Sequence, residues 1–186
     1  MIQQPALVNL VISSGEPAGV GPEVSIAAAL AFLQEQPASA ITLLSDSSLI
    51  PATKIPQELS NRLKVESIAL ASPVIAGQLN PTNAQYVLSI LDAAVQGCLD
   101  GHFDAMVTAP IQKSVMNQGN TSSDDLFTGH TEYLAKLCHQ DHVVMMLCAI
   151  LPTGFLGLQK SRDLRVALVT THLPLRDVPS ALNQQH

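Results

Sequence analysis

The stretch VNLVISSGEPAGVGPEVSIAAALAF, residues 8–32, decides the fold. Residues 8–12 form a short apolar run that predicts a strand, and Ser13, Ser14 and Gly15 follow it directly. Pro22 then opens a periodic segment that predicts a helix. Its apolar face is expected to consist of four residues, Val24, Ala27, Ala28 and Ala31. The order of strand, glycine loop and helix is typical of the first unit of an α/β sheet.

The composition favours the same class of fold. Of the 186 residues, 47% are hydrophobic, 13% are charged and 3% are aromatic. A core of Val, Ile, Leu and Ala suits parallel strands that are covered on both faces. The net charge of −6 argues against binding to nucleic acid or to an anionic membrane, because both need clustered Lys and Arg. A small-molecule substrate is therefore expected.

Further apolar runs extend this pattern along the chain. Strands are predicted at residues 41–44, 105–108, 143–147 and 165–170, and helices at 83–98 and 131–138. Residues 45–56 are expected to form a loop with a helical turn, and residues 143–158 a buried strand followed by a turn at Pro152 and Gly154. Strands that alternate with helices predict an α/β fold with a doubly wound, mostly parallel sheet.

Polar residues follow three of the predicted strands, where the ligands of open α/β sheets bind. These clusters are Ser13-Ser14-Gly15-Glu16, Thr108-Ala109-Pro110 and Thr170-Thr171-His172. The glycine loop at residues 15–23 offers free N–H groups to an anion, but it matches neither GxGxxG nor the P-loop. A tight structural turn is the favoured interpretation of this loop.

Histidines supply the other candidate site residues. His130 and Thr131, in the segment FTGHTE, begin a predicted helix, where an imidazole and a hydroxyl can converge on a polar ligand. His172 is a candidate ligand for a divalent metal. For each histidine, spacing alone favours a structural role. His139 and His142 are expected to lie in a solvated turn, and the three Cys, which form no CxxC pair, indicate reduced thiols in a cytoplasmic protein.

Five motifs, taken in their order along the chain, resemble the 4-hydroxythreonine-4-phosphate dehydrogenases of vitamin B6 biosynthesis. They are ISSGEPAGVGPEV, VTAPIQKSVMNQGN, FTGHTEYLA, VVMML and LRVALVTTHLPLRDVPSAL, and they run from residue 12 to residue 182. The most specific are GHTE and TTHLPL. The resemblance implies a two-domain α/β subunit of the isocitrate and isopropylmalate dehydrogenase type, which works as a homodimer.

The same resemblance implies the reaction. NAD or NADP would oxidise 4-phosphohydroxy-L-threonine to 2-amino-3-oxo-4-phosphooxybutanoate, which decarboxylates to 3-amino-2-oxopropyl phosphate on the way to pyridoxal 5'-phosphate. A divalent metal (zinc, magnesium or cobalt) would assist by polarising the substrate hydroxyl. By resemblance, His130 and Thr131 contact the substrate and His172 is the first of three metal-binding histidines. No residue is assigned to the nicotinamide cofactor or as a catalytic acid or base.

Three features depart from the family pattern. Glu16 stands where the family usually has Asp, and residues 148–163 form a longer link than usual between VVMML and LRVAL. The helix predicted to begin near Val178, with Asp177 as N-cap, has room for about two turns before His186. We therefore expect residues 1–186 to be the N-terminal part of a subunit, including the start of its second domain, and to be inactive alone.

Two other functions remain open. A sister dehydrogenase that acts on 4-phospho-threonate or 4-phospho-erythronate would share these N-terminal motifs. Alternatively, the chain is a noncatalytic remnant or interaction module, whose exposed apolar surface is covered by a partner.

Overall fold

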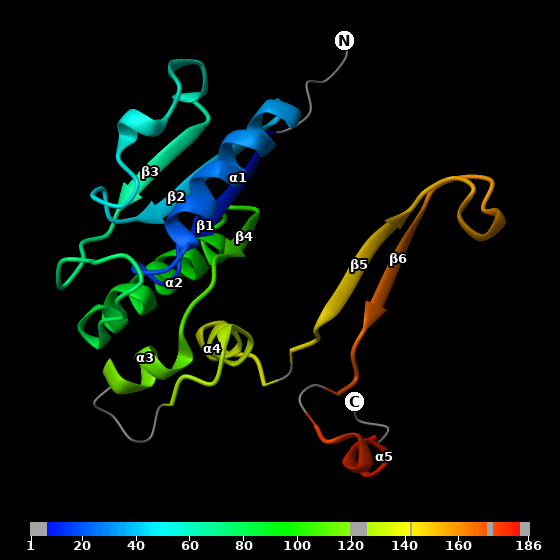
Figure 1. Ribbon diagram of the computed structural model, residues 1–186. Helices are drawn as coiled ribbons and strands as arrows, with labels where there is room; N and C mark the ends of the chain where they lie inside the picture. Colours follow the sequence, from blue (N-terminus) through cyan, green and yellow to red (C-terminus); the bar gives the residue numbers. More distant parts are fainter. Residues whose placement is uncertain (1–6, 120–125, 142, 171–172, 183–186) are drawn as a thin grey trace. The chain divides into compact units, whose positions relative to one another are not determined.

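The computed structural model describes residues 7–119, 126–141, 143–170 and 173–182 (Figure 1). The chain divides into two compact units, Met1–Cys138 and His139–His186. The first unit contains a parallel sheet with helices on both of its faces. The second contains an antiparallel hairpin and short helical turns.

The sheet of the first unit has four strands in the order β3-β2-β1-β4. They are β1 (Val8–Ser13), β2 (Ser39–Ser45), β3 (Leu63–Ser67) and β4 (Ala105–Thr108). Every neighbouring pair is parallel, and Val11 of β1 is aligned with both Thr42 of β2 and Met106 of β4. The strands predicted at residues 8–12, 41–44 and 105–108 are confirmed, whereas β3 was not predicted.

Side chains of the central strands alternate between two cores, because successive residues of a strand point to opposite faces. Val11 of β1 packs with helix α2 (Ala84–Leu99), and its neighbour Ile12 packs with helix α1 (Gly21–Glu35). In β2, Leu44 packs with α2 and its neighbour Leu43 packs with α1. Both faces of the sheet are therefore covered, which explains why its central strands are almost continuously apolar.

Helix α1 buries a different face from the one predicted. Val24, Ala27, Ala28 and Ala31 are exposed. The buried residues are Gly21, Pro22, Ser25, Ile26, Ala29 and Leu33. The helix is so rich in alanine that two stripes fit a helical period, and the stripe that carries the larger Ile26 and Leu33 removes more apolar surface from water.

The other helices of the first unit agree better with the pattern. The helix predicted at residues 83–98 is confirmed as α2, which buries apolar residues at three- and four-residue steps, namely Ala84, Val87, Leu91, Ala94 and Val95. Helix α4 (His130–Leu137) matches the prediction for residues 131–138, and α3 (Lys113–Gly119) was not predicted. The 3-10 turns η1 (Ala52–Lys54) and η2 (Gln57–Leu59) follow β2, and the first of them confirms the helical turn expected in residues 45–56. A third, η3 (Pro81–Asn83), leads into α2.

The second unit corrects the prediction for residues 143–170. Strands β5 (Met146–Leu151) and β6 (Arg162–Ala167) pair antiparallel as a two-stranded sheet of their own, and β5 is largely exposed rather than buried. The turn at Pro152 and Gly154 sends the chain directly back, with η4 (Phe155–Gly157) in the loop. A direct return of this kind can only join antiparallel strands, because a parallel pair needs a long crossover.

The described chain ends in η5 (Leu175–Asp177) and α5 (Val178–Ala181). The predicted helix thus begins at Val178, and Asp177 occupies its N-cap position without a capping hydrogen bond from its side chain. Among the described residues, no helix is long and apolar enough to cross a membrane. The fold is mixed α/β with a parallel sheet, as expected, while the specific isocitrate dehydrogenase type stays a prediction.

Candidate functional site at the carboxyl ends of the strands

The first unit has a topological switch point between β1 and β4. The chain runs from β1 to β2 and β3 on one side, and then crosses to β4 on the other side of β1. Ligands of open α/β sheets bind outside the carboxyl ends of the strands at such a point. The polar clusters after β1 and β4 lie together there: the N–H of Ala109 donates to the Ser13 carbonyl at 3.0 Å, and that of Glu16 to the Pro110 carbonyl at 2.9 Å.

Two glycines allow this close contact between loops. Gly15 has φ +72°, and a Cβ atom there would lie 2.3 Å from the carbonyl oxygen of Pro110. A Cβ atom on Gly21 would lie 2.1 Å from the carbonyl oxygen of Ser14. These contacts support the interpretation of residues 15–23 as a tight structural turn, because the backbone approaches at distances that only glycine allows.

Glu16 is the buried acid of this turn. Its side chain is buried, with 5% of the residue exposed, and its Oε1 accepts a hydrogen bond from the N–H of Ala18 at 3.2 Å. Burial raises the pKa of the Glu16 carboxyl above its ordinary value of 4.5, although the Ala18 hydrogen bond opposes that shift. The carboxyl group thus lies next to the switch point in a setting that favours its protonated form.

Tyr86 of α2 joins the ends of β1 and β2. Its hydroxyl lies 3.1 Å from Oγ of Ser14, accepts from the N–H of Asp46 at 3.1 Å and lies 3.4 Å from Oγ of Ser45. Ser13 Oγ, at the end of β1, is buried and has no hydrogen-bond partner among the described residues. Sequence patterns did not indicate Tyr86, because its hydroxyl partners lie 40 to 72 residues away in the chain.

The GHT segment, Gly129 to Thr131, begins helix α4 and is anchored by Phe127. Asn117 of α3 bonds both backbone groups of Phe127: its Oδ1 accepts from the Phe127 N–H at 2.7 Å, and its Nδ2 donates to the Phe127 carbonyl at 3.2 Å. The Phe127 ring packs in the core with α2, and it meets the His130 ring edge-on with centroids 6.3 Å apart. The position of His130 therefore follows from the core.

His130 is half-buried, and its Nε2 is a buried atom without a hydrogen-bond partner among the described residues. Burial, and secondarily the positive charge of Lys113, lowers the pKa of the imidazole from its ordinary value of 6.5. A neutral imidazole at neutral pH can accept or donate a hydrogen bond to a ligand. Thr131, the next residue of α4, is also half-buried.

Lys113, the first residue of α3, was not among the predicted site residues. The connection from β4 to α3 carries Pro110, which bonds the Glu16 loop, and then Lys113, whose ammonium group lies beside Gly129. The same connection thus contacts both the switch point and the GHT segment. Its sequence position, three residues after Pro110, did not indicate this contact, because packing of α3 against the GHT segment sets it.

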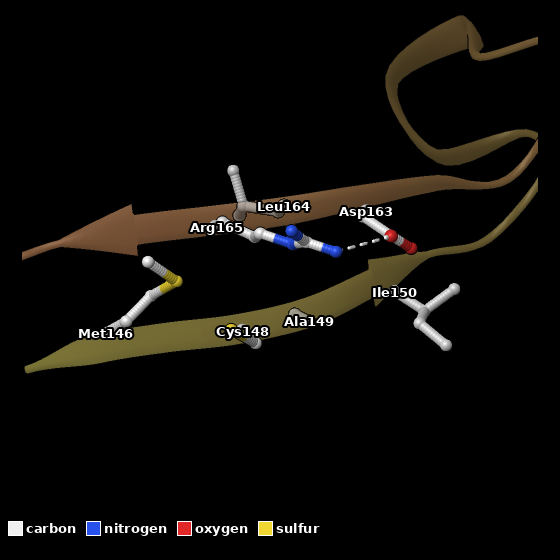
Figure 2. A pocket seen from close by; sticks show the side chains of 7 residues that line it. All are labelled: Met146, Cys148, Ala149, Ile150, Asp163, Leu164 and Arg165. Atoms are coloured by element: carbon white, nitrogen blue, oxygen red, sulfur yellow. Dashed lines mark hydrogen bonds and ion pairs between the residues drawn. The ribbon is translucent and has the colours of Figure 1, made fainter.

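A cavity of about 400 Å³ lies along α4, and its described lining includes Thr128 and Glu132, on either side of the GHT segment, but not His130, Thr131 or Lys113. Apolar side chains form most of its wall, and Thr128, Glu132 and Lys136 add polar groups. A second hollow, of about 500 Å³, lies along the β5–β6 hairpin (Figure 2). Its only charged groups are Asp163 and Arg165, an exposed pair 3.5 Å apart. The chemistry available in the first unit therefore favours the GHT segment as the candidate site.

The candidate metal ligand His172, with Thr171, lies outside the described residues, as does His142. His139 lies at the end of α4 with φ 53° and is exposed, in agreement with the expected turn. Within the described ranges, no group of three His, Cys, Asp or Glu side chains is placed to hold a metal ion. The three cysteines are free thiols.

Comparisons with known proteins show which proteins the chain is similar to. Residues 21–186 match the model of the family "Pyridoxal phosphate biosynthetic protein PdxA". A 4-hydroxythreonine-4-phosphate dehydrogenase of Burkholderia vietnamiensis is 43% identical over 183 residues, which cover 95% of this chain and 52% of that protein. The chain thus spans about half the length of the curated relatives it matches.

Solved structures give the same result. The crystal structure of a 4-hydroxythreonine-4-phosphate dehydrogenase from Burkholderia phymatum aligns with a TM-score of 0.67 and 26% identity, over 92% of this chain and 52% of that one. The Klebsiella pneumoniae enzyme of the same name aligns with a TM-score of 0.70 over 96% of this chain and 55% of that one. Its 22% identity supports the fold alone.

Proposed function

The chain belongs to the PdxA family of pyridoxal phosphate biosynthetic proteins, and from this premise we propose that it forms the N-terminal half of a 4-hydroxythreonine-4-phosphate dehydrogenase. The proposed reaction is oxidation of 4-phosphohydroxy-L-threonine by NAD or NADP to 2-amino-3-oxo-4-phosphooxybutanoate, which decarboxylates to 3-amino-2-oxopropyl phosphate. The observation that carries this proposal is the family match over residues 21–186, which includes the GHT segment.

The proposal includes the organisation of the whole subunit. Residues 1–186 would comprise the N-terminal part of a two-domain subunit and the start of its second domain, and the complete protein would be a cytoplasmic homodimer. The length of the relatives supports this view, because the chain covers 52% of the Burkholderia vietnamiensis protein. A phosphorylated small molecule, rather than nucleic acid or a membrane, is the proposed partner, in keeping with the net charge of −6.

We assign substrate contacts to His130 and Thr131. The unpartnered Nε2 of His130 supports this role, because a buried nitrogen without a partner loses hydrogen-bond energy that a ligand can restore. The lowered pKa of His130 supports it further, since a neutral imidazole can receive a proton or a hydrogen bond from the substrate. The anchoring of Phe127 by Asn117 would hold the imidazole in place before the substrate binds.

We also propose His172 as one ligand of a divalent metal, zinc, magnesium or cobalt. Such a metal supplies Lewis-acid polarisation of a substrate oxygen when it is bound. The described residues hold no donor set for it, so no step is assigned to the metal. The nicotinamide cofactor likewise has no assigned residue.

The test compares the 186-residue chain with its reading frame extended downstream. Reduction of NAD and of NADP is followed with 4-phosphohydroxy-L-threonine, 4-phospho-threonate and 4-phospho-erythronate as substrates. We expect turnover of the first substrate by the extended protein, and none by the short chain. Preference for the threonate or erythronate would assign the chain to the sister enzyme.

Two variants of the extended protein test the assigned residues. His130→Ala and Thr131→Val should each lower kcat/KM by at least about tenfold, because each removes a hydrogen bond to the substrate. His139→Ala is the matched control, since this exposed histidine lies at the other end of α4. Equal activity of His130→Ala and the control would contradict the assignment.

A further inference from the structure

The side chain of Lys113 reaches from the start of α3 to the GHT segment. A Cβ atom placed on Gly129 would lie 3.3 Å from Nζ of Lys113 and 3.5 Å from its Cε. The ammonium group therefore occupies the space beside Gly129 that the side chain of any other residue would take. Gly129 is buried, and the next residue along the chain is His130.

This ammonium group has no ion-pair partner among the described residues. The carboxylate of Glu132 also lies beside Gly129, because its Oε2 would lie 2.9 Å from the same Cβ position. The two side chains flank Gly129 without forming an ion pair. The charge of Lys113 nevertheless acts on His130, because it is a cause of the lowered pKa of that imidazole.

The two assigned substrate contacts do not balance the negative charge of the substrate. Thr131 is neutral, and His130 is held toward its neutral form, so neither residue balances the charge of a phosphate or a carboxylate. Hydrogen bonds in which both partners are charged are shorter and stronger than neutral ones, and lysine is a common partner of phosphate. A cation beside the GHT segment would complete the recognition of an anionic substrate.

We propose that Lys113 is a further substrate-binding residue, whose ammonium group binds an anionic group of the substrate beside His130 and Thr131. This inference rests on the proposed function, from which the substrate contacts of His130 and Thr131 are taken. The substrate carries both a phosphate and a carboxylate, and either supplies the required negative oxygens. The structural alternative is that Lys113 and Glu132 only stabilise the start of α4.

The test is a titration of the protein extended downstream, followed by NMR signals of the His130 ring and the Thr131 amide. The ligands are 4-phosphohydroxy-L-threonine, inorganic phosphate and L-threonine. Lys113→Met should weaken binding of the first ligand by about tenfold or more, and Lys113→Arg should retain most of it. Lys64→Met is the matched control, because it removes the same charge from an exposed position on β3, the opposite edge of the sheet.

The two partial ligands identify the group that Lys113 binds. If Lys113→Met weakens the binding of inorganic phosphate, Lys113 binds the phosphate of the substrate. If it weakens the binding of L-threonine, Lys113 binds the carboxylate. Thermal unfolding of each variant separates binding from stability. Under the structural alternative, Lys113→Met and Glu132→Gln would lower Tm similarly and leave binding unchanged, which would overturn the proposal.

Other outcomes distinguish this proposal from the function on which it rests. If His130→Ala loses binding and Lys113→Met does not, the role of Lys113 is wrong and the substrate site stands. If Lys113→Met loses binding and His130→Ala and Thr131→Val do not, the role of Lys113 stands and the two assigned contacts are wrong. If no ligand moves the His130 and Thr131 signals of the unaltered protein, the substrate-binding roles of all three residues are wrong, and turnover by the extended protein tests the proposed reaction separately.

Discussion

The hydroxyl of Tyr86 lies 3.1 Å from Oγ of Ser14, although the two residues are 72 positions apart. The same hydroxyl accepts the N–H of Asp46, so one side chain of α2 ties together the carboxyl ends of β1 and β2. Tyr86 is only 2% exposed, and water cannot readily replace these bonds. The arrangement of the switch-point loops therefore depends on a buried phenol from a helix outside them.

Tyr86→Phe should destabilise the protein by about 1–3 kcal/mol, because it leaves buried or half-buried partners without a hydrogen bond. The free energy of unfolding in urea measures this loss. Ser89→Ala is the control, since it removes an exposed hydroxyl bond to the Gln85 carbonyl on the same helix. A loss no larger than that of the control would show that the Tyr86 hydroxyl contributes nothing to stability.

Gly21→Ala should cost about 3 kcal/mol or more. The added Cβ atom would lie 2.1 Å from the carbonyl oxygen of Ser14, and a clash with backbone cannot be relieved by turning a side chain. Gly77→Ala is the control, because that glycine has φ +77° but open space around it, so the cost is about 1–2 kcal/mol of backbone strain. Equal losses in thermal or urea unfolding would contradict the steric argument.

In the first unit, the sequence pattern predicted the positions of strands and helices better than it predicted which of their faces are buried. Apolar runs identified β1, β2 and β4, but β3 was missed because Lys64 and Glu66 alternate with its apolar residues at the edge of the sheet. The buried face of α1 was predicted wrongly because alanine carries little information about burial. The antiparallel pairing of β5 with β6 follows from the direct return of the chain between them, which the apolar pattern of the two strands does not show by itself.

The candidate site was predictable where it follows from strand direction. Parallel strands bring their carboxyl ends to one edge, which placed the Ser13–Ser14 cluster beside Thr108 and Pro110. Tyr86 and Lys113 were missed because they come from elements whose contact with the strand ends is set by packing. A lysine after a proline or a tyrosine in an amphipathic helix carries no such signal by itself.

Glu16→Gln should raise the stability of the protein more at neutral pH than at acidic pH. Burial raises the pKa of the Glu16 carboxyl above 4.5, so the folded state binds its proton more tightly than the unfolded state does. The contribution of Glu16 to stability is therefore full below pH 4.5 and is lost as pH rises through the folded pKa. The uncharged glutamine avoids this loss.

Urea unfolding of both proteins at several pH values measures the effect. Glu58→Gln, at an exposed position in η2, is the matched control for the same substitution. The difference in free energy of unfolding between Glu16→Gln and the unaltered protein should grow as pH rises from about 4 toward about 7, because the Glu16 carboxyl loses its proton in this range. A difference that does not change with pH would show that Glu16 has no raised pKa in the folded state.

Lys113→Met should raise the pKa of His130 without restoring its ordinary value of 6.5. Burial is the larger cause of the lowered pKa, and the substitution removes only the smaller cause, the positive charge. NMR titration of the His130 ring measures the shift directly. Lys64→Met should leave the His130 titration unchanged, and full recovery of the ordinary value in Lys113→Met would mean that charge rather than burial dominates.

Ile150→Lys should reduce self-association of the chain without loss of stability. Ile150 is 75% exposed on β5 and shares its face of the hairpin with Met146, which is 50% exposed, while Leu147, Leu164 and Val166 are exposed on the other face. An exposed apolar hairpin with unpaired strand edges favours contact with other chains. The substitution interrupts this surface and places an ammonium group opposite Asp163, its partner across the strands, which adds about 0.2–1 kcal/mol of cross-strand attraction.

Light scattering as a function of protein concentration measures the association, and Tm measures the stability. Gln85→Lys adds the same charge at an exposed position of α2, so it separates the loss of apolar surface from the change in net charge. If both variants reduce association equally, net charge rather than the hairpin governs it. If only Ile150→Lys does so, the β5–β6 hairpin is the surface through which the chain associates.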